Sequence, residues 1–193
     1  MNGCRTIIAA TLLGLAACTA QPAAAPPLAG ARIGGPFRLV DGDRRTFTER
    51  NLLGRYAIVY FGYTFCPDAC PTDMAAIGAG LKQVEASDPA LGAKVVPVFV
   101  TVDPVRDTPA VVRTFARTFH PRAIGLTGTP AAIDAVAKEY GVAHSIGAKS
   151  AGGYLVDHSR AAYLMGPDGK PIALVGQDGG PAAVAATIRQ WVR

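Results

Sequence analysis

Residues 60–71, YFGYTFCPDACP, join an apolar, β-rich run at residues 57–62 to a segment with helical periodicity at residues 71–85. In that segment the apolar positions recur every three or four residues, which is typical of a helix with one buried face. These positions are Met74, Ile77, Leu81 and Val84. The stretch predicts a buried strand, a loop carrying Cys66 and Cys70, and a helix that begins near Cys70. Functional groups gather at the carboxyl ends of strands in open α/β sheets, so we expect the chemistry of this protein in this loop.

Strands and helices alternate outward from this loop. A cap residue followed by proline predicts helix starts at Thr108-Pro109, Thr129-Pro130 and Gly180-Pro181. Further apolar, β-rich runs predict strands at residues 37–40, 45–47, 94–102, 124–126, 161–165 and 172–175. Pro97, inside one of these runs, fits a bulge or an edge. The alternation, which finishes in a hairpin and a helix, predicts one α/β domain with a thioredoxin-like fold, a central mixed β-sheet flanked by helices.

The N-terminal residues differ in composition from the rest. Arg5 precedes an apolar run at residues 6–17, which suits a secretory signal but is too short to span a bilayer, since a spanning helix needs about 20 residues. The run ends in LAAC, residues 15–18, which resembles a bacterial lipobox. Ordinary cleavage near residues 23–25 is the alternative, but it would place proline directly after the cut.

These features predict the organisation of the chain. We expect a lipoprotein signal peptide at residues 1–17, lipidation of Cys18, an Ala/Pro-rich tether at residues 18–32 and a folded domain at residues 33–193.

Cys66 and Cys70 would then be the remaining free thiols. A purely structural disulfide is disfavoured, because so short a loop constrains the unfolded chain little. A redox dithiol also fits the strand–loop–helix arrangement, although thioredoxins place two residues between their cysteines and this chain places three. We favour a metal clamp, because a helix start stabilises thiolates and two soft thiolates select Cu(I) or Zn²⁺. A further ligand would have to be a histidine or a carboxylate.

Three histidines are available as that ligand. His120 follows a predicted helix and fits a loop or capping residue, and His144 lies in a short polar stretch without a nearby partner in sequence. His158 precedes the strand predicted at residues 161–165. The residue pattern alone gives none of the three a metal role. Met74 and Met165 fall on predicted core positions, so we do not count them as ligands.

The composition excludes other classes of protein. Half of the 193 residues are hydrophobic and 17% are charged, which is typical of a globular domain. The net charge of +5 is modest and the arginines are scattered, so we expect no nucleic-acid partner.

Several sequence blocks, in order over about residues 34–176, resemble the Sco/SenC family. They are GPF (35–37), YFGYTFCPDACP (60–71), TVDP (101–104), RDT (106–108), LTGT (126–129), Tyr154, DHS (157–159), Tyr163-Leu164 and PDG (167–169). The resemblance implies a thioredoxin-like domain that binds copper through Cys66, Cys70 and His158, held at a membrane by a helix or a lipid. The chain does not depart from the family pattern at these ligand positions.

The resemblance also implies a function. It is that of a copper metallochaperone for the binuclear copper centre of cytochrome c oxidase. The expected partners are the copper-site subunit of the oxidase, or another copper-accepting protein, and a thioredoxin-like reductant. Asp103 and Asp157 are candidates for an additional Cu(II) ligand or for orienting His158, with turn capping as the alternative for both. With a lipid on Cys18, we expect the domain to face the periplasm from a membrane of a bacterial cell envelope.

Two alternatives remain open at this point. One is a membrane-tethered thiol–disulfide oxidoreductase that acts on the cysteines of the oxidase subunit, and the other is a copper or redox sensor. His158 separates the chaperone from the oxidoreductase, because a dithiol reductase does not require it.

Overall fold

The computed structural model describes residues 25–150 and 153–193. Its centre is a seven-stranded sheet with the strand order β2-β1-β5-β4-β3-β8-β9. The strands are β1 (Arg38–Asp41), β2 (Thr46–Thr48), β3 (Tyr56–Gly62), β4 (Val95–Thr101), β5 (Ile124–Thr127), β8 (Ala162–Met165) and β9 (Pro171–Leu174). β4 pairs in parallel with β3 and β5, and the other pairings are antiparallel. The sheet is therefore mixed, as predicted.

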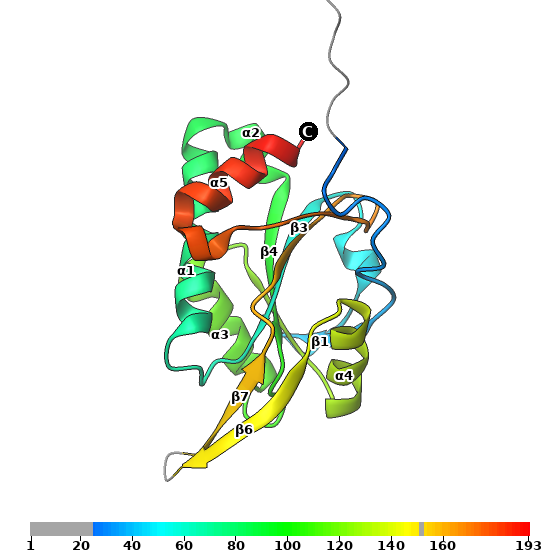
Figure 1. Ribbon diagram of the computed structural model, residues 1–193, viewed down its shortest axis with the longest axis vertical. Helices are drawn as coiled ribbons and strands as arrows, with labels where there is room; N and C mark the ends of the chain where they lie inside the picture. Colours follow the sequence, from blue (N-terminus) through cyan, green and yellow to red (C-terminus); the bar gives the residue numbers. More distant parts are fainter. Residues whose placement is uncertain (1–24, 151–152) are drawn as a thin grey trace, which may run out of the picture.

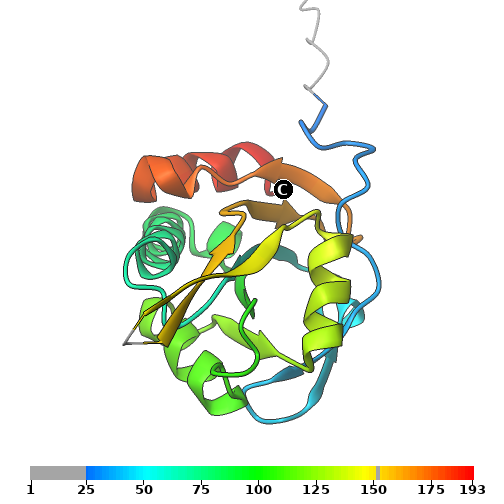
Figure 2. The same ribbon diagram turned by 60° about the horizontal axis from the view of Figure 1, so that its bottom comes forward.

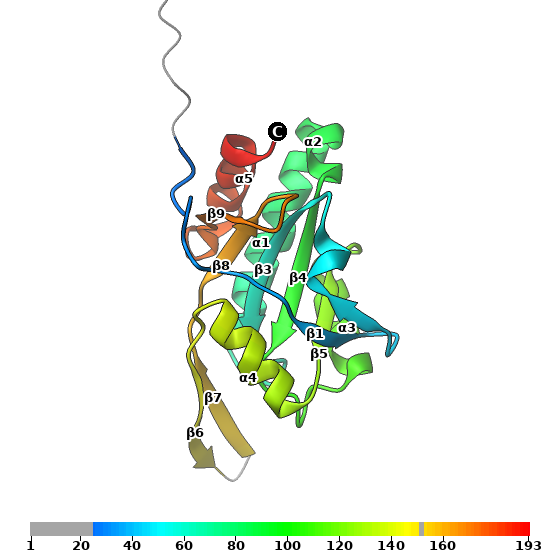
Figure 3. The same cartoon turned by 90° about the vertical axis from the view of Figure 1, so that its right-hand side faces the viewer.

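Helices cover both faces of this sheet (Figures 1 and 3). α1 (Ala69–Ser87), α3 (Pro109–Phe119) and α5 (Gly180–Trp191) lie on one face, and α4 (Pro130–Glu139) lies on the other. The short helix α2 (Pro89–Ala93) follows α1, and two 3₁₀ turns complete the helical elements, η1 (Glu49–Leu52) and η2 (Gln177–Gly179). This arrangement confirms the predicted sheet with flanking helices.

β3 and β4 form the centre of the core because both of their faces are covered. Six of the seven residues of β3 and all seven of β4 are buried. Such continuous apolar runs are typical of parallel strands between two layers of helices. Pro97 lies inside β4, which is a central strand, but pairing with β5 begins only at Val98. At Pro97 itself the strand is paired with β3 alone, so the proline lies at a local edge.

A second, two-stranded sheet was not predicted. β6 (His144–Ser150) and β7 (Gly153–His158) form an antiparallel hairpin that projects from one end of the molecule (Figure 1). The carboxyl ends of β3 and β4 point to this same end, and the hairpin crosses it in the view of Figure 2. The hairpin therefore lies next to the loop that follows β3.

The structure also gives the start of α1 and the first contacts on the N-terminal side. α1 begins at Ala69, next to Cys70, near which the helix was predicted to begin, so Cys70 lies inside its first turn. At the N-terminal side, the Leu28 backbone N–H donates to the Ile172 carbonyl at 3.0 Å, and Leu28 packs against the core. Ordered contacts with the domain therefore begin before residue 33.

Candidate metal centre

The loop between β3 and α1 places Cys66 and Cys70 close together. Both are free thiols, Cys66 half-buried and Cys70 fully buried. The Cys70 backbone N–H donates to Cys66 Sγ at 3.4 Å. Gly62 ends β3 directly against the second thiol, since a Cβ at this position would lie 3.0 Å from Cys70 Sγ. A glycine here is what allows α1 to bring its first turn onto the end of the strand.

The two thiols have opposite pKa shifts. Burial would raise the pKa of Cys66, but the backbone N–H groups of Cys70 and Asp68 favour the thiolate and the net pKa is lowered. Burial raises the pKa of Cys70 to about 12, and its neighbour Cys66 adds to the rise. Cys66 is therefore the readier thiolate, while Cys70 retains its proton near neutral pH.

His158, the last residue of β7, meets Cys70 from the other side. Its Nε2 lies 3.3 Å from Cys70 Sγ, and its Nδ1–H donates to the Ser159 carbonyl at 2.9 Å. Burial lowers the pKa of His158, which favours the neutral ring. The Tyr60 and Tyr63 rings approach it edge-on, with centroids 6.4 and 5.9 Å away. This tautomer presents the Nε2 lone pair to the thiol, the form in which imidazole binds metals.

The three predicted ligands thus converge from two distant parts of the chain. Cys70 and His158 are in contact, and Cys66 is joined to them through the amide of Cys70. Within residues 25–150 and 153–193, no group of three or more His, Cys, Asp or Glu side chains is already arranged to hold a metal ion. The donor set, two thiols and an imidazole, is one that fits a soft metal.

The other two histidines take different positions. His120 is buried where α3 ends and contacts Glu85. His144 stands directly opposite His158 in the hairpin register, and its Nε2 lies 3.2 Å from Asp134 Oδ1. The partner that the local sequence lacked is thus supplied by α4.

Asp103 and Asp157 were the candidates for orienting His158, and the contacts of Asp103 are with other side chains. The buried Asp103 carboxylate accepts a hydrogen bond from Tyr154 at 2.8 Å and forms an ion pair with Arg106. Asp157 is exposed. Orientation of the His158 ring comes instead from the Ser159 carbonyl, and a metal role for either aspartate stays a prediction.

Sequence reasoning missed two buried carboxylates that support the site. Asp107 accepts hydrogen bonds from the Thr64 backbone N–H at 3.0 Å and from the Thr101 hydroxyl at 2.6 Å, which joins the Cys loop to the end of β4. Asp73, in α1, accepts from the Tyr60 hydroxyl at 2.9 Å and pairs with Arg160. An acidic residue three positions after Cys70, on a helix with a buried face, was the available signal for Asp73.

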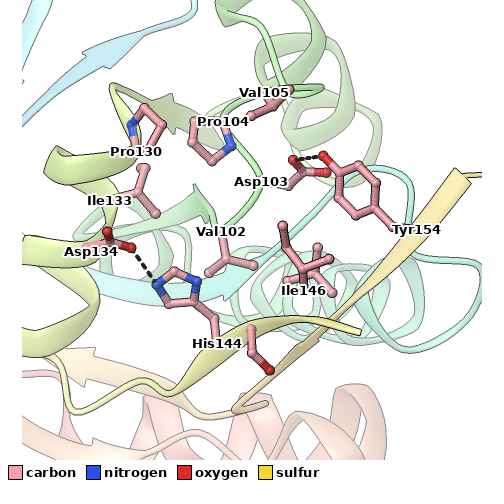
Figure 4. A pocket seen from close by; sticks show the side chains of 12 residues that line it. Val102, Asp103, Pro104, Val105, Pro130, Ile133, Asp134, His144, Ile146 and Tyr154 are labelled. Carbon is pink, nitrogen blue, oxygen red and sulfur yellow. Dashed lines mark hydrogen bonds and ion pairs between the residues drawn. The ribbon is translucent and has the colours of Figure 1, made fainter. Parts of the chain in front are cut away.

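A cavity of about 270 Å³ lies between the hairpin, α4 and the loop after β4 (Figure 4). Its walls are mostly aliphatic, and two polar pairs flank them, His144 with Asp134 and Tyr154 with Asp103. The apolar lining residues are Val102, Pro104, Val105, Pro130, Ile133, Ile146 and Val156. Val105 and Ile146 are also strongly exposed to solvent.

Curated relatives resemble most of this chain. The mitochondrial protein SCO1 homolog 1 of Arabidopsis thaliana is 45% identical over 143 residues, which are 74% of this chain and 42% of that protein. The mitochondrial protein SCO1 of Saccharomyces cerevisiae is 40% identical over 148 residues, 76% of this chain and 49% of that protein. The chain thus matches about half the length of these relatives.

These relatives correct the prediction of a lipid-anchored protein in a bacterial cell envelope. The proteins from Arabidopsis thaliana and Saccharomyces cerevisiae are mitochondrial, and that finding overturns the predicted location. Cys18 and the signal peptide predicted at residues 1–17 lie outside the described residues. No helix in the described part of the chain has the length and apolar character needed to cross a membrane.

Solved structures are similar to this fold, and a family model matches the sequence. Arabidopsis thaliana ScoI with copper bound matches with a TM-score of 0.76 at 38% identity, covering 82% of this chain and 97% of that one. Yeast Sco1 with copper bound matches with a TM-score of 0.74 at 38% identity, covering 82% and 87%. These matches confirm the thioredoxin-like fold. The SCO1/SenC family model matches residues 25–193, and the chain belongs to the SCO1/SenC family.

Proposed function

We propose that this chain is a copper metallochaperone that binds one copper ion through Cys66, Cys70 and His158. The observation that carries the proposal is the contact between Cys70 Sγ and His158 Nε2 at 3.3 Å, because it brings an imidazole to a dithiol across 88 positions of sequence. Two thiolates and a neutral imidazole suit Cu(I). The copper-bound Sco structures give the same metal for relatives of this chain.

The difference between the thiols suggests how copper enters. Cys66 is the more exposed sulfur and has the lowered pKa, so it would bind the incoming ion first. Cys70 must then lose a proton, which metal binding promotes. His158 closes the site from the hairpin with the Nε2 that already faces Cys70. A three-ligand site leaves a position where a ligand of the acceptor can enter, so copper passes by ligand exchange.

We infer that the acceptor is the copper-site subunit of cytochrome c oxidase or another protein with a soft-ligand copper site. The basis for this acceptor is membership of the SCO1/SenC family. Loading requires both thiols to be reduced, so a thioredoxin-like reductant is a second partner.

A second function is favoured by the thiol pair itself. A half-buried thiol with a lowered pKa beside a buried thiol with a raised pKa is the arrangement of an attacking and a resolving cysteine. Thiol–disulfide exchange with the cysteines of an acceptor is therefore the alternative activity. A copper or redox sensor would use the same residues.

Copper titration of the purified, reduced chain tests these proposals. The chaperone proposal predicts one copper per chain with thiolate-to-copper absorption, and loss of tight binding in Cys66→Ala, Cys70→Ala and His158→Ala. His158→Ala would leave disulfide exchange largely intact, because that reaction needs the thiols alone. His144→Ala is the matched control, since this histidine lies opposite His158 in the hairpin yet pairs with Asp134.

The outcomes separate the two functions. If His158→Ala bound copper as tightly as the parent and with the same spectrum, the three-ligand site would be wrong. Binding of no copper, together with rapid disulfide exchange, would favour the oxidoreductase.

A further inference from the structure

An ion pair with a buried carboxylate joins the segment that carries Cys70 to the segment that carries His158. Asp73 follows Cys70 by three residues in α1 and has no exposed surface, and Arg160 follows His158 by two residues. Arg160 Nη2 donates to Asp73 Oδ1 at 2.7 Å, and its Nε donates to Oδ2 at 3.1 Å. A two-point arginine–carboxylate pair fixes the orientation of its partners as well as their separation.

Tyr60 extends this pair to the imidazole. Its hydroxyl donates to Asp73 Oδ2 at 2.9 Å, and its ring stands edge-on to the His158 ring with 6.4 Å between centroids. Asp73 thus fixes a side chain that forms one wall of the histidine pocket. Both carboxylate oxygens are engaged by donors, which makes Asp73 a support of the site rather than a ligand.

His158 requires such support because of where it stands in the fold. It ends a two-stranded hairpin that is separate from the seven-stranded sheet. An isolated hairpin of two strands is marginally stable, so contacts with the body must fix its position. Arg160 lies two residues beyond the end of the hairpin and supplies such a contact through its ion pair with Asp73.

We propose that Asp73 is a positioning residue of the metal centre, which holds the His158 imidazole against Cys70 through Arg160 and Tyr60. This inference rests on the proposed copper function and deepens it. Its consequence is that the geometry of the Cys70–His158 contact depends on a carboxylate that does not touch the metal.

Asp73→Asn tests this role, because it keeps the shape of the side chain and removes its charge. Cu(I) affinity, measured by competition with a chelator, should fall about tenfold, the lower range for residues that orient a metal ligand. In the His158→Ala background the same substitution should change the remaining affinity by less than about twofold, since a positioning effect vanishes with the residue positioned.

Glu85→Gln is the matched control. Glu85 also lies in α1 and forms an ion pair, with Arg122, but away from the metal centre. It should leave copper affinity unchanged at a comparable loss of thermal stability. An affinity loss in Glu85→Gln equal to that in Asp73→Asn would overturn the positioning role, as would an equal effect of Asp73→Asn with and without His158.

A copper-free measurement separates this inference from the proposed function. The chain has three histidines, so their ring signals can be followed by NMR. Asp73→Asn should shift the His158 ring signals and leave those of His120 and His144 in place, whereas Glu85→Gln should shift those of His120. An unshifted His158 would overturn the positioning role, and failure of the parent to bind copper would overturn the proposed function alone.

Arg160→Gln provides a second variant if Asp73→Asn does not fold. Arg160 keeps 51% of its side chain exposed, so its replacement disturbs the core less. It should reproduce the shift of the His158 ring signals and the loss of copper affinity. A parent-like His158 ring and parent-like affinity in this variant would also contradict the proposal.

Discussion

At the scale of single residues, Cys66 and Cys70 differ although they share one short loop. Cys66 lies outside the helix, where backbone N–H groups face its sulfur, and Cys70 lies within the first turn, fully buried. The first environment stabilises a thiolate, and the second penalises one. The loop therefore holds one reactive sulfur and one protected sulfur, an order that suits stepwise capture of a metal ion.

Alkylation measures this difference directly. With iodoacetamide at pH 7.5, we expect Cys66 to be modified at least about tenfold faster than Cys70, because the thiolate is the nucleophile. Peptide mapping by mass spectrometry distinguishes these sites from Cys4 and Cys18. The difference should disappear in urea, which removes both environments. Equal rates in the native protein would show that the two sulfurs share one environment.

At the scale of elements, the hairpin β6–β7 is held to the body by Arg106. The Arg106 guanidinium carbon lies 3.7 Å from the centroid of the Tyr154 ring and 4.9 Å from that of Phe65. Arg106 also forms an ion pair with Asp103, which accepts a hydrogen bond from the Tyr154 hydroxyl. One side chain thus joins the hairpin, the Cys loop and the loop after β4, and Asp103 takes part in holding the hairpin.

Arg106→Met should loosen the hairpin while leaving the central sheet intact. The change removes the cation–π contacts, worth about 1–2 kcal/mol where partly desolvated, and the ion pair with Asp103. Hydrogen exchange of the β7 amides should accelerate, and that of the β3 amides should not. Arg106→Lys should fall between, because an ammonium lacks the planar stacking surface. Unchanged exchange in β7 would mean that other contacts hold the hairpin.

The same elements show what the sequence could predict. β3 and α1 were predictable because each shows its pattern, an apolar run or a helical period, within consecutive residues. The position of the Cys loop followed, because this loop connects the two elements. The hairpin was not, because β6 reads HSIGAKS without regular alternation and depends on contacts such as Arg106 with Tyr154. The prediction that His158 is a ligand came from family resemblance alone. Asp73 and Arg160 pair across 87 positions, and no local pattern announces such a pair.

At the scale of the whole molecule, a network around the buried His120 ties helices together away from the Cys loop. His120 Nε2 lies 3.2 Å from Glu85 Oε2, and its Nδ1 accepts the Arg122 backbone N–H at 3.2 Å. Arg122 also donates to the carbonyls of Gly92 and Ala93 at the end of α2. α1, α2 and the segment after α3 are thus joined, and α2 lies at the opposite end of the molecule from the hairpin (Figure 1).

This network makes stability depend on pH in a definite direction. Burial lowers the pKa of His120, and protonation would also place a hydrogen on the Nδ1 that now accepts the Arg122 N–H. The unfolded chain therefore binds this proton more readily than the folded chain. Stability from His120 is complete above the unfolded pKa, near 6.5, and is lost as pH falls through the folded value. The lowered pKa of Glu85 acts in the same sense below about 4.5, since Arg122 and His120 stabilise its carboxylate against burial.

The expected result is a free energy of unfolding that declines from pH 7 toward pH 5 in the copper-free protein. His158 also has a lowered pKa and adds to the decline. Each histidine can lower the free energy of unfolding of the parent by at most about 1.4 kcal/mol per pH unit. His120→Gln should reduce the slope, because the amide keeps a donor toward Glu85 but does not titrate. Urea unfolding at half-unit pH steps gives both slopes. Identical slopes would mean that His120 takes up its proton equally in both states, which its burial between α1 and the end of α3 argues against.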